Sequence, residues 1–313
     1  MTMTNPYREV EVEPYSDEWH ATRLPYLGAS EAAGSLDLSP YQSPTSIYLE
    51  KIGEIGPKDL GNRGVWGKRL ENAIAEAFED EFPHLRAEAR DVVVISNLYP
   101  WMSATLDRFV YDTQGIARRL IGVLEIKTAD AWSASDWGTK EAPVCPAHVL
   151  IQLLHQMAVT GLPYGWVAVL IGTSDFRVIE IVRDERTEKM ITNLVEGERR
   201  FWDLVEKRTP PKIDGSGATT DAIKRQYAEV DPEAVVQFEE DIYELIAEWH
   251  WRDHDAKAAK KALDSVANKI KDRFGKCEIG MVGERVVATY RSFSVKEKYV
   301  KAGTQRRLNV KEI

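Results

Sequence analysis

The feature that most constrains this 313-residue chain is a repeated change of hydrophobic period between about residues 66 and 182. It opens with a stretch in which apolar residues recur every three or four positions, the period of one helix face. Three runs rich in β-branched residues follow, then an apolar helical run and two more strand-like runs. The helical runs are 66–82 and 147–161, and the strand-like runs are 91–96, 104–112, 119–129, 166–172 and 176–182. This order predicts an α/β (α+β) fold with a mixed central sheet flanked by helices.

The clearest domain boundary is TPPKIDGSGATT at residues 209–220, because it concentrates Pro, Gly, Ser and Thr. We therefore expect a domain over 1–208, a linker over 209–220 and an appendage of unknown role over 221–313. Within the appendage, 230–274 is helical in pattern, which suggests a helical hairpin. GERVVATYRSF and RRLNVKEI suggest a small β-ribbon, and no apolar heptad is sustained long enough to predict a coiled coil.

The net charge of −9 would ordinarily count against a nucleic-acid partner, but the charge is unevenly spread. Residues 229–255 hold ten acids and one base, and residues 257–313 hold fifteen bases and six acids, so the local charges are −9 and +9. Two interpretations stay open at this point. The appendage is either a solvated hairpin with faces of opposite sign or a basic tail near a phosphate backbone.

Several protein classes are disfavoured by what the chain lacks. The first residues show no basic patch followed by an apolar run, so we expect no secretory signal and a cytoplasmic protein. The most membrane-like stretch, 148–172, is interrupted by Gln, His, Gly and Pro residues and is better described as a helix, a turn and a strand. Two cysteines, Cys145 and Cys277, are too few for a disulfide scaffold or a four-thiolate iron–sulfur cluster.

The residues best suited to chemistry lie on two neighbouring strand-like runs. Asp107 lies on one, and the triplet Glu125-Ile126-Lys127 lies on the next. Side chains at positions i and i+2 of a strand share a face, so Glu125 and Lys127 point the same way, and an antiparallel neighbour can bring Asp107 beside them. Two carboxylates of this kind suit Mg²⁺, and the lysine can orient or help deprotonate an attacking water. The set is that of a metal-assisted phosphodiesterase.

A surface strand with a cross-strand ion pair could have the same Glu-x-Lys sequence. Against that alternative, Glu125 and Lys127 alternate with Ile121 and Val123 in a run that is otherwise apolar. We therefore expect the two charges to share a face with aliphatic residues, where an unpaired charge is costly.

Two helices add polar residues to faces that are otherwise apolar. His148, Gln152 and either His155 or Gln156 recur at spacings of three and four on the second helix. A polar stripe on such a helix is directed at a polar group. On the earlier helix, Glu71 shares a face with apolar residues and is a candidate for a partly buried carboxylate.

This order of residues resembles the PD-(D/E)XK restriction-endonuclease-like core, and more closely the YqaJ-like viral recombinase and phage lambda exonuclease family. The resemblance is carried by Glu71, Asp107, Glu125-x-Lys127 and Gln152, on helix, strand, strand and helix. Trp19-x-x-x-Arg23 followed by Gly28-Ala29-Ser30-Glu31 is similar to the opening signature of these proteins. GNRGVWGKRLE and QLLHQMAVTG are similar to their two site-bearing helices, and the likeness covers about residues 15–205.

The resemblance implies a Mg²⁺-dependent 5′ to 3′ exonuclease, with Mn²⁺ able to substitute, that acts on double-stranded DNA ends. It would leave 3′ single-stranded overhangs for a single-strand annealing protein in phage-type recombination. A ring of three identical subunits threaded by DNA is also implied, with no membrane partner. The setting implied is a phage or prophage protein in the cytoplasm of a bacterial host.

Carried over residue by residue, the resemblance assigns the metal to Asp107, Glu125 and the main-chain carbonyl of Ile126. Lys127 would serve the nucleophilic water, and Glu71, itself a further candidate ligand, would complete the catalytic site with Gln152. Arg23 and Ser30 would hold the DNA 5′-phosphate. The chain departs from the family's S-P-D-G pattern, because it has Thr105-Leu106-Asp107-Arg108.

Two other functions are kept open. The first is a RecB-like or CRISPR-associated nuclease acting on single-stranded DNA, although members with an iron–sulfur cluster need four cysteines. The second is a non-catalytic DNA-end-binding recombination adaptor with the same fold.

Overall fold

A computed structural model describes residues 5–57, 61–229, 231 and 233–292. The chain divides into two compact units, Met1–Val230 and Asp231–Ile313. Among the described residues, no helix combines the length and the apolar character needed to span a membrane.

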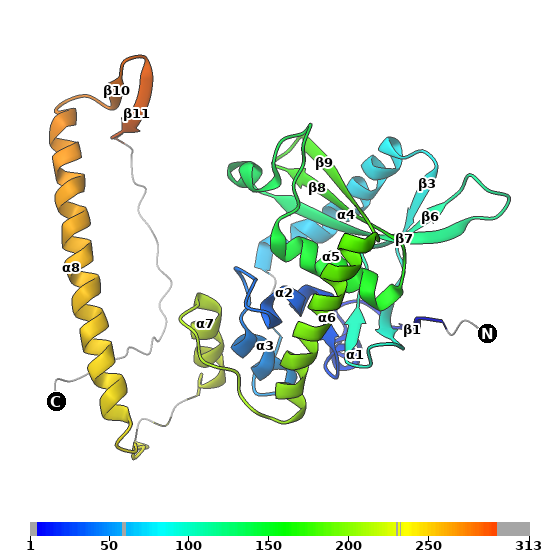
Figure 1. Ribbon diagram of the computed structural model, residues 1–313, viewed down its shortest axis with the longest axis horizontal. Coiled ribbons are helices and arrows are strands. Elements are labelled where there is room, and N and C mark those ends of the chain that lie inside the picture. Colours follow the sequence, from blue (N-terminus) through cyan, green and yellow to red (C-terminus); the bar gives the residue numbers. More distant parts are fainter. Residues whose placement is uncertain (1–4, 58–60, 230, 232, 293–313) are drawn as a thin grey trace. The chain divides into compact units, whose positions relative to one another are not determined.

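The first unit holds nine strands and interleaved helices in its described part (Figure 1). The strands are β1 (Tyr7–Glu11), β2 (Leu27–Gly28), β3 (Leu85–Glu88), β4 (Val92–Ser96), β5 (Met102–Ala104), β6 (Arg108–Asp112), β7 (Arg119–Ala129), β8 (Tyr164–Ile171) and β9 (Asp175–Val182). The α-helices are α1 (Asp17–Arg23), α2 (Ala32–Ser35), α3 (Pro44–Lys51), α4 (Gly61–Glu81), α5 (Ala147–Thr160), α6 (Glu185–Glu206) and α7 (Gly217–Gln226). Two 3-10 helices, η1 (Ala29–Glu31) and η2 (Ala131–Trp137), complete the unit.

The central sheet has five strands in the order β3-β6-β7-β8-β9. Strand β7 pairs antiparallel with β6 and parallel with β8, and the parallel pair is joined through α5. A second, four-stranded sheet has the order β1-β4-β5-β2. The predicted mixed α/β fold with a central sheet flanked by helices is confirmed.

Helices cover both faces of the central sheet, and the alternation of residues along β7 follows from this. On one face, Leu124 and Ile126 pack in a cluster with Phe78 of α4. On the other face, Val123 packs in a cluster with Leu153 of α5. Because side chains of a strand alternate between faces, Glu125 and Lys127 share the α5 face with Val123.

The predicted strand over 104–112 is divided in the structure. Strand β5 ends at Ala104 and β6 begins at Arg108, so Asp107 precedes β6 instead of lying within it. A register shift between β6 and β7 lies opposite Ile121, and this bulge turns Ile121 to the α4 face. The expectation that Ile121 shares a face with Glu125 is therefore wrong, because a bulge reverses the alternation.

A third cluster explains where the first unit ends. Ala222 of α7 is buried with Ile47 of α3 and Trp202 of α6. Thr219 also donates to Ser43 at 2.7 Å. The boundary between units therefore lies at Val230, later than the predicted linker, because α7 adds to the core of the first unit.

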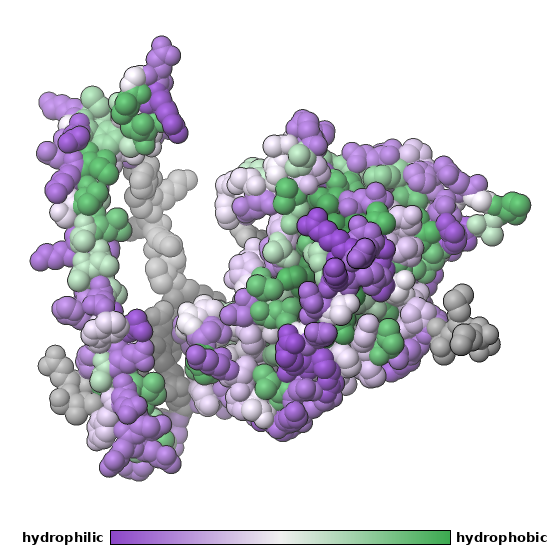
Figure 2. All heavy atoms as spheres, viewed as in Figure 1, coloured by the Kyte–Doolittle hydropathy of each residue, from purple (hydrophilic) through white to green (hydrophobic). Residues whose placement is uncertain are grey.

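The second unit contains α8 (Ile242–Phe274) and the antiparallel hairpin of β10 (Ile279–Val282) and β11 (Arg285–Thr289). Its described part has one long helix where a helical hairpin was expected. Helix α8 begins directly after the acids at 239–241, because negative charge is favourable at a helix N-terminus. The predicted ribbon strand RRLNVKEI lies outside the described residues. Many large apolar side chains of this unit are exposed (Figure 2).

Candidate active site

Glu125 is the centre of a hydrogen-bonded cluster between β7 and α5. It is 2% exposed, and Lys127 Nζ lies 2.6 Å from its Oε1. Gln152 Nε2 donates to the same oxygen at 2.7 Å, and Gln156 Nε2 donates to Oε2 at 2.5 Å. Lys127 also donates to Gln152 Oε1 at 3.0 Å. The cluster therefore holds the Glu125 carboxylate by both oxygens.

Asp107 joins this cluster from the chain just before β6. Its Oδ2 accepts a hydrogen bond from the main-chain N–H of Ile126 at 2.7 Å, which places the carboxylate beside the middle of β7. Burial raises the pKa of Asp107 well above its usual range, and the negative charge of Glu125 raises it further. Burial alone would lower the pKa of Lys127, but Glu125 and Asp107 outweigh it and raise that pKa. The group of three carries a net negative charge when ionised.

Glu71 approaches from α4 but is paired with an arginine. Arg108 Nη1 lies 3.8 Å from Glu71 Oε2, and the Arg108 guanidinium also donates to Asn72 at 2.6 Å. Burial raises the pKa of Glu71, and Arg108 opposes the rise. Arg108 occupies the place of the glycine in the S-P-D-G pattern, so the departure from that pattern places a cation between Glu71 and the strand.

A cavity of about 390 Å³ brings the predicted site residues together. Glu71, Asp107, Glu125, Ile126, Lys127 and Gln152 line it, and so do Arg23 and Ser30. A neighbouring cavity of about 860 Å³ shares Tyr15, Trp19, Arg23, Ser30, Gly64 and Lys68 with it. All eight residues that the family resemblance assigned to the site therefore line one cavity.

On the Arg23 side of the cleft, the guanidinium is held by contacts with Trp19 and Ser30. The guanidinium of Arg23 lies 4.0 Å over the ring of Trp19, and its Nη2 donates to Ser30 Oγ at 3.4 Å. A Cβ at Gly28 would come within 2.8 Å of that Nη2, so glycine makes room for the guanidinium. This leaves a fixed cation and a hydroxyl facing the cavity, which suits an anionic group.

A buried ion pair lies directly behind this cation. Lys51 of α3 lies 2.8 Å from Glu31, and both side chains are almost fully buried. Glu31 Oε2 also accepts from the main-chain N–H of Gly28 at 2.7 Å. Sequence reasoning missed the role of Lys51, although a lysine at the end of the apolar run Ile47-Tyr48-Leu49 was an available signal.

The choice left open between His155 and Gln156 is resolved by the direction of each side chain. Gln156 faces Glu125, whereas His155 is directed to the opposite side of α5. There its Nδ1 lies 2.8 Å from Glu198 Oε1 of α6, and its Nε2 lies 2.9 Å from the carbonyl of Ser103 in β5. All of this is buried, so His155 joins three elements of the core instead of lining the cleft.

The donor set is compatible with a hard divalent ion. Within the described ranges, no three or more His, Cys, Asp or Glu side chains gather in a metal-binding cluster. Three carboxylates line the cavity, Asp107 and Glu125 beside Lys127 and Glu71 from α4, and the main-chain carbonyl of Ile126 is a further candidate donor. Mg²⁺ needs only one or two carboxylates because it keeps several waters and takes substrate phosphate oxygens. Glu71 lines the same cavity with its carboxylate 3.8 Å from Arg108, and its role as a further ligand stays a prediction.

Cys145 does not add a nucleophile. Burial raises the pKa of its thiol to about 12, so the thiolate is scarce at neutral pH. His148, the first residue of the polar stripe, packs edge-on against Tyr41 at 5.6 Å between ring centroids. Burial and the nearby Lys127 lower the pKa of His148. Neither residue makes a contact that assigns it to the Glu125 cluster.

Glu71 lies on α4, Asp107 just before β6, Glu125 and Lys127 on β7, and Gln152 on α5, in the chain order expected from the sequence. Residues 18–163 match the family described as the YqaJ-like viral recombinase domain. A protein of Bacillus subtilis (strain 168) named "Uncharacterized protein YqaJ" is 26% identical over 271 residues, covering 85% of this chain and 81% of that protein.

Two of the solved structures to which the chain is similar are described as exonucleases. The alkaline exonuclease LHK-Exo from Laribacter hongkongensis has a TM-score of 0.48 at 19% identity, with 62% of this chain and 96% of that chain covered. A phage related exonuclease from Haemophilus somnus 129PT has a TM-score of 0.40 at 10% identity, with 60% and 98% covered.

Proposed function

We propose that the chain, whose residues 18–163 match the YqaJ-like viral recombinase domain family, belongs to this family and is a metal-dependent exonuclease acting on DNA ends. The observation that carries the proposal is the convergence of Asp107, Glu125, Lys127 and Gln152 on one wall of the cleft. Burial raises the pKa of Asp107 and the neighbouring Glu125 raises it further, so this carboxyl is costly to keep ionised in the fold. A divalent cation would offset that cost.

The residues divide the work of phosphodiester hydrolysis. A bound Mg²⁺, or Mn²⁺ in its place, would supply charge stabilisation at the scissile phosphate and would be held by Asp107, Glu125 and the Ile126 carbonyl. Gln152 and Gln156 hold Glu125 in one orientation. Lys127 Nζ, fixed between Glu125 and Gln152, is placed to donate to the attacking water or to a phosphate oxygen.

The Arg23 side of the cleft supports recognition of a phosphorylated end. Arg23 is held flat by Trp19 and Ser30, so its guanidinium can bind a terminal phosphate by two parallel hydrogen bonds. With the 5′-phosphate there and the scissile bond at Glu125, digestion would run 5′ to 3′ on double-stranded DNA. The 3′ overhang produced would serve a single-strand annealing protein in phage-type recombination, and a trimeric ring would keep the enzyme on its strand.

One assay tests catalysis and polarity together. Duplex DNA is labelled separately at each 5′ and 3′ end, with 5′-phosphate or 5′-hydroxyl termini, and incubated with Mg²⁺ or with EDTA. We expect mononucleotides from the 5′-phosphorylated end and none in EDTA. Lys127→Ala and Glu125→Gln should each lower the rate by about 10²–10⁴-fold while binding of DNA ends persists. Lys189→Ala, at an exposed lysine of α6, is the matched control.

The other outcomes identify the alternatives. Cleavage of single strands that ignores the chemistry of the 5′ end would instead indicate a RecB-like or CRISPR-associated nuclease. A wild-type protein that binds ends but releases no nucleotide with any divalent metal would indicate a recombination adaptor.

A further inference from the structure

Helix α8 carries an apolar stripe that is exposed among the described residues and that nothing in the proposed catalysis uses. Starting at Leu245, alternating steps of four and three residues reach Ile270 and meet an apolar residue at every position except Arg252. Leu263 is 62% exposed and Val266 is 53% exposed, in a helix of 33 residues. The stripe extends about 38 Å along the helix axis. Its period of 3.5 residues over nearly four heptads is that of a coiled-coil seam.

The period of 3.5 residues is recognised once the bounds of α8 are known. In the sequence alone, Tyr243, Ile246 and Trp251 lie beside the stripe and obscure it, so no sustained heptad was expected. At the C-terminal end of α8, Phe274 packs against Tyr290 with ring centroids 5.9 Å apart. Figure 2 shows hydrophobic residues exposed along the helix. An apolar seam of this length on a charged helix is a surface for another helix.

We propose that the occupant is α8 of a second copy of this chain, in antiparallel orientation. The stripe is nearly symmetric about its midpoint, between Ala256 and Ala259. A twofold axis there places the small residues Ala256 and Ala259 opposite each other, where two backbones can approach closely. The proposal does not depend on the proposed nuclease function.

The same axis pairs residues of complementary size on either side of the centre. Leu245 faces Ile270, and Trp249 faces Val266. Arg252 faces Leu263, where its aliphatic stem can cover the leucine while its guanidinium stays in water. Every layer of the seam therefore contains an apolar contact.

The charges that flank the stripe select this orientation. In the antiparallel pair Glu248 lies beside Lys269 of the other copy, and Asp253 lies beside the other copy's Lys260. A parallel pair would place Arg252 against Arg252 and Glu248 against Asp253. Flanking charges set the orientation of paired helices, so the antiparallel arrangement is favoured.

These charges are available to change partners. Glu248 pairs with Arg252 at 3.3 Å and Lys260 pairs with Asp264 at 2.6 Å within the single helix. Exposed pairs of this kind contribute only about 0.3–0.5 kcal/mol, so exchanging them for contacts between copies costs little. The uneven charge of the C-terminal region thus has a physical use, since each acidic half meets a basic half.

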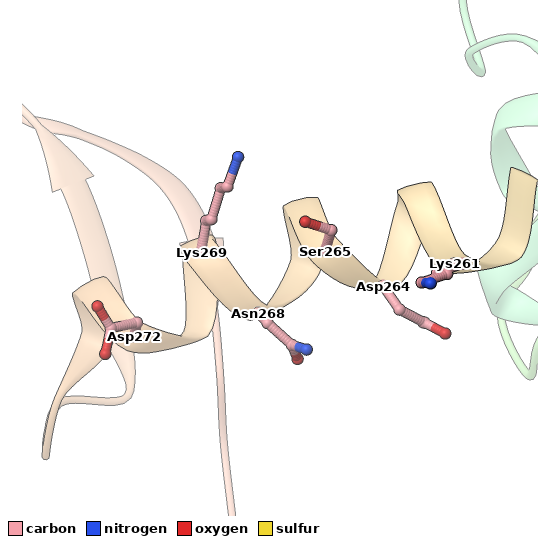
Figure 3. Close-up of a pocket in the computed structure, with 6 residues that line it drawn as sticks. All are labelled: Lys261, Asp264, Ser265, Asn268, Lys269 and Asp272. Atoms are coloured by element: carbon pink, nitrogen blue, oxygen red, sulfur yellow. The ribbon is translucent and has the colours of Figure 1, made fainter. Parts of the chain in front are cut away.

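A polar hollow on the same helix supplies a control surface. Figure 3 shows six polar side chains, Lys261, Asp264, Ser265, Asn268, Lys269 and Asp272, all from α8. Except for Lys269, which flanks the stripe, they point away from the proposed seam. Asn268 is thus a surface position two residues from Val266 that pairing leaves in water.

The test is the mass of the full-length protein in solution across a range of concentrations. Pairing doubles the number of chains per particle, from one to two or, if the first units form rings, from three to six. Val266→Glu should abolish the doubling, because it places a charge against Trp249, and Asn268→Glu should leave it intact. Helix content and nuclease activity should be unchanged in both variants, since neither residue lies in the catalytic cleft.

A charge exchange tests the orientation. Glu248→Lys and Lys269→Glu, each alone, should raise the dissociation constant by about tenfold, because each converts two attractive contacts into two repulsive ones. An equimolar mixture of the two variants should restore pairing to within about twofold of wild type. The proposal is overturned if Val266→Glu and wild type have equal mass, or if the mixture pairs no better than its components.

Discussion

Among single residues, Asp107 is the carboxyl of the cleft whose ionised form is most strongly disfavoured by burial and by a neighbouring charge. It is buried beside Glu125, and its pKa is raised by burial first and by that neighbour second. A carboxyl whose pKa is higher in the folded than in the unfolded state binds its proton more tightly when folded. Stability is therefore lost as the pH rises from the unfolded pKa through the folded one. The carboxyl that we propose as a metal ligand should therefore destabilise the metal-free fold at neutral pH.

Asp107→Asn should accordingly stabilise the metal-free protein at neutral pH. The amide can still accept the hydrogen bond from Ile126, and each kcal/mol regained raises Tm by about 2–4 °C in a domain of this size. The gain should shrink toward low pH, where the wild-type carboxyl is protonated. Mg²⁺ should raise the Tm of wild type and leave that of Asp107→Asn unchanged. The exposed Asp80 of α4, changed to Asn, is the control, and an equal Mg²⁺ response in all three proteins would argue against the site.

A substitution of Arg23 tests the proposed recognition of the 5′-phosphate. Arg23→Lys keeps the charge but removes the flat two-pronged donor that stacks on Trp19. We expect the preference for 5′-phosphate over 5′-hydroxyl ends, measured as a ratio of kcat/KM values, to fall by roughly 10-fold or more. Arg199→Lys is the matched control, because Arg199 also stacks on a tryptophan, Trp101, outside the cleft. A uniform loss on both ends would mean that Arg23 has only a structural role.

Among the elements, the packing of α5 against β8 determines where the α5 side chains of the cleft lie. Gly165 of β8 lies under the helix, and a Cβ there would come within 2.8 Å of Met157 Sδ and 3.0 Å of Leu153. The same helix carries Gln152 and Gln156, which hold Glu125. A change at this contact therefore reaches the site through the helix.

Gly165→Val should displace α5 and cost about 1–3 kcal/mol of stability through overpacking. It should also lower kcat by roughly tenfold, because a displacement of about 1 Å is enough to disturb a catalytic arrangement. KM for DNA should change much less, since α5 does not carry Arg23. Gly56→Ala, where a Cβ meets nothing within 4 Å, is the control. Wild-type kcat in a destabilised Gly165→Val protein would show that the site tolerates movement of α5.

Across the whole molecule, an acidic chain must bind a polyanion through a local surface. The net charge is −9, yet the two neighbouring cavities share Arg23 and Lys68, and Lys127 lines the inner one. Lys68 also lies 4.1 Å over the ring of Tyr15. Phosphate contacts made here release counterions, so DNA binding should weaken with salt despite the overall charge.

Lys68→Ala should weaken DNA binding to a similar degree for all sequences and lower the slope of log K against log salt by about 1. The measurement is a salt titration of duplex binding at several ionic strengths. Lys257→Ala on α8, outside the first unit, is the control and should leave the slope unchanged. An unaltered slope in Lys68→Ala would place the bound phosphates elsewhere.

Much of the fold and of the site can be predicted from neighbouring residues. Strand β7 has the predicted bounds, α5 differs by one residue, and the periods that predicted them are properties of continuous segments. Glu125 and Lys127 share a face because they are two apart on one strand, which needs no knowledge of the rest of the chain. The family resemblance rests on this same local spacing.

The remaining features depend on contacts between residues far apart in the chain. The bulge opposite Ile121, the ion pair between Lys51 and Glu31, and the pairing of Arg108 with Glu71 arise from register and packing, which no local period encodes. The same applies to Gln156 and His155, adjacent residues whose roles differ because β7 lies on one side of α5 and α6 on the other. Spacing along the chain predicts which side chains share a surface, and packing selects the group that each one meets.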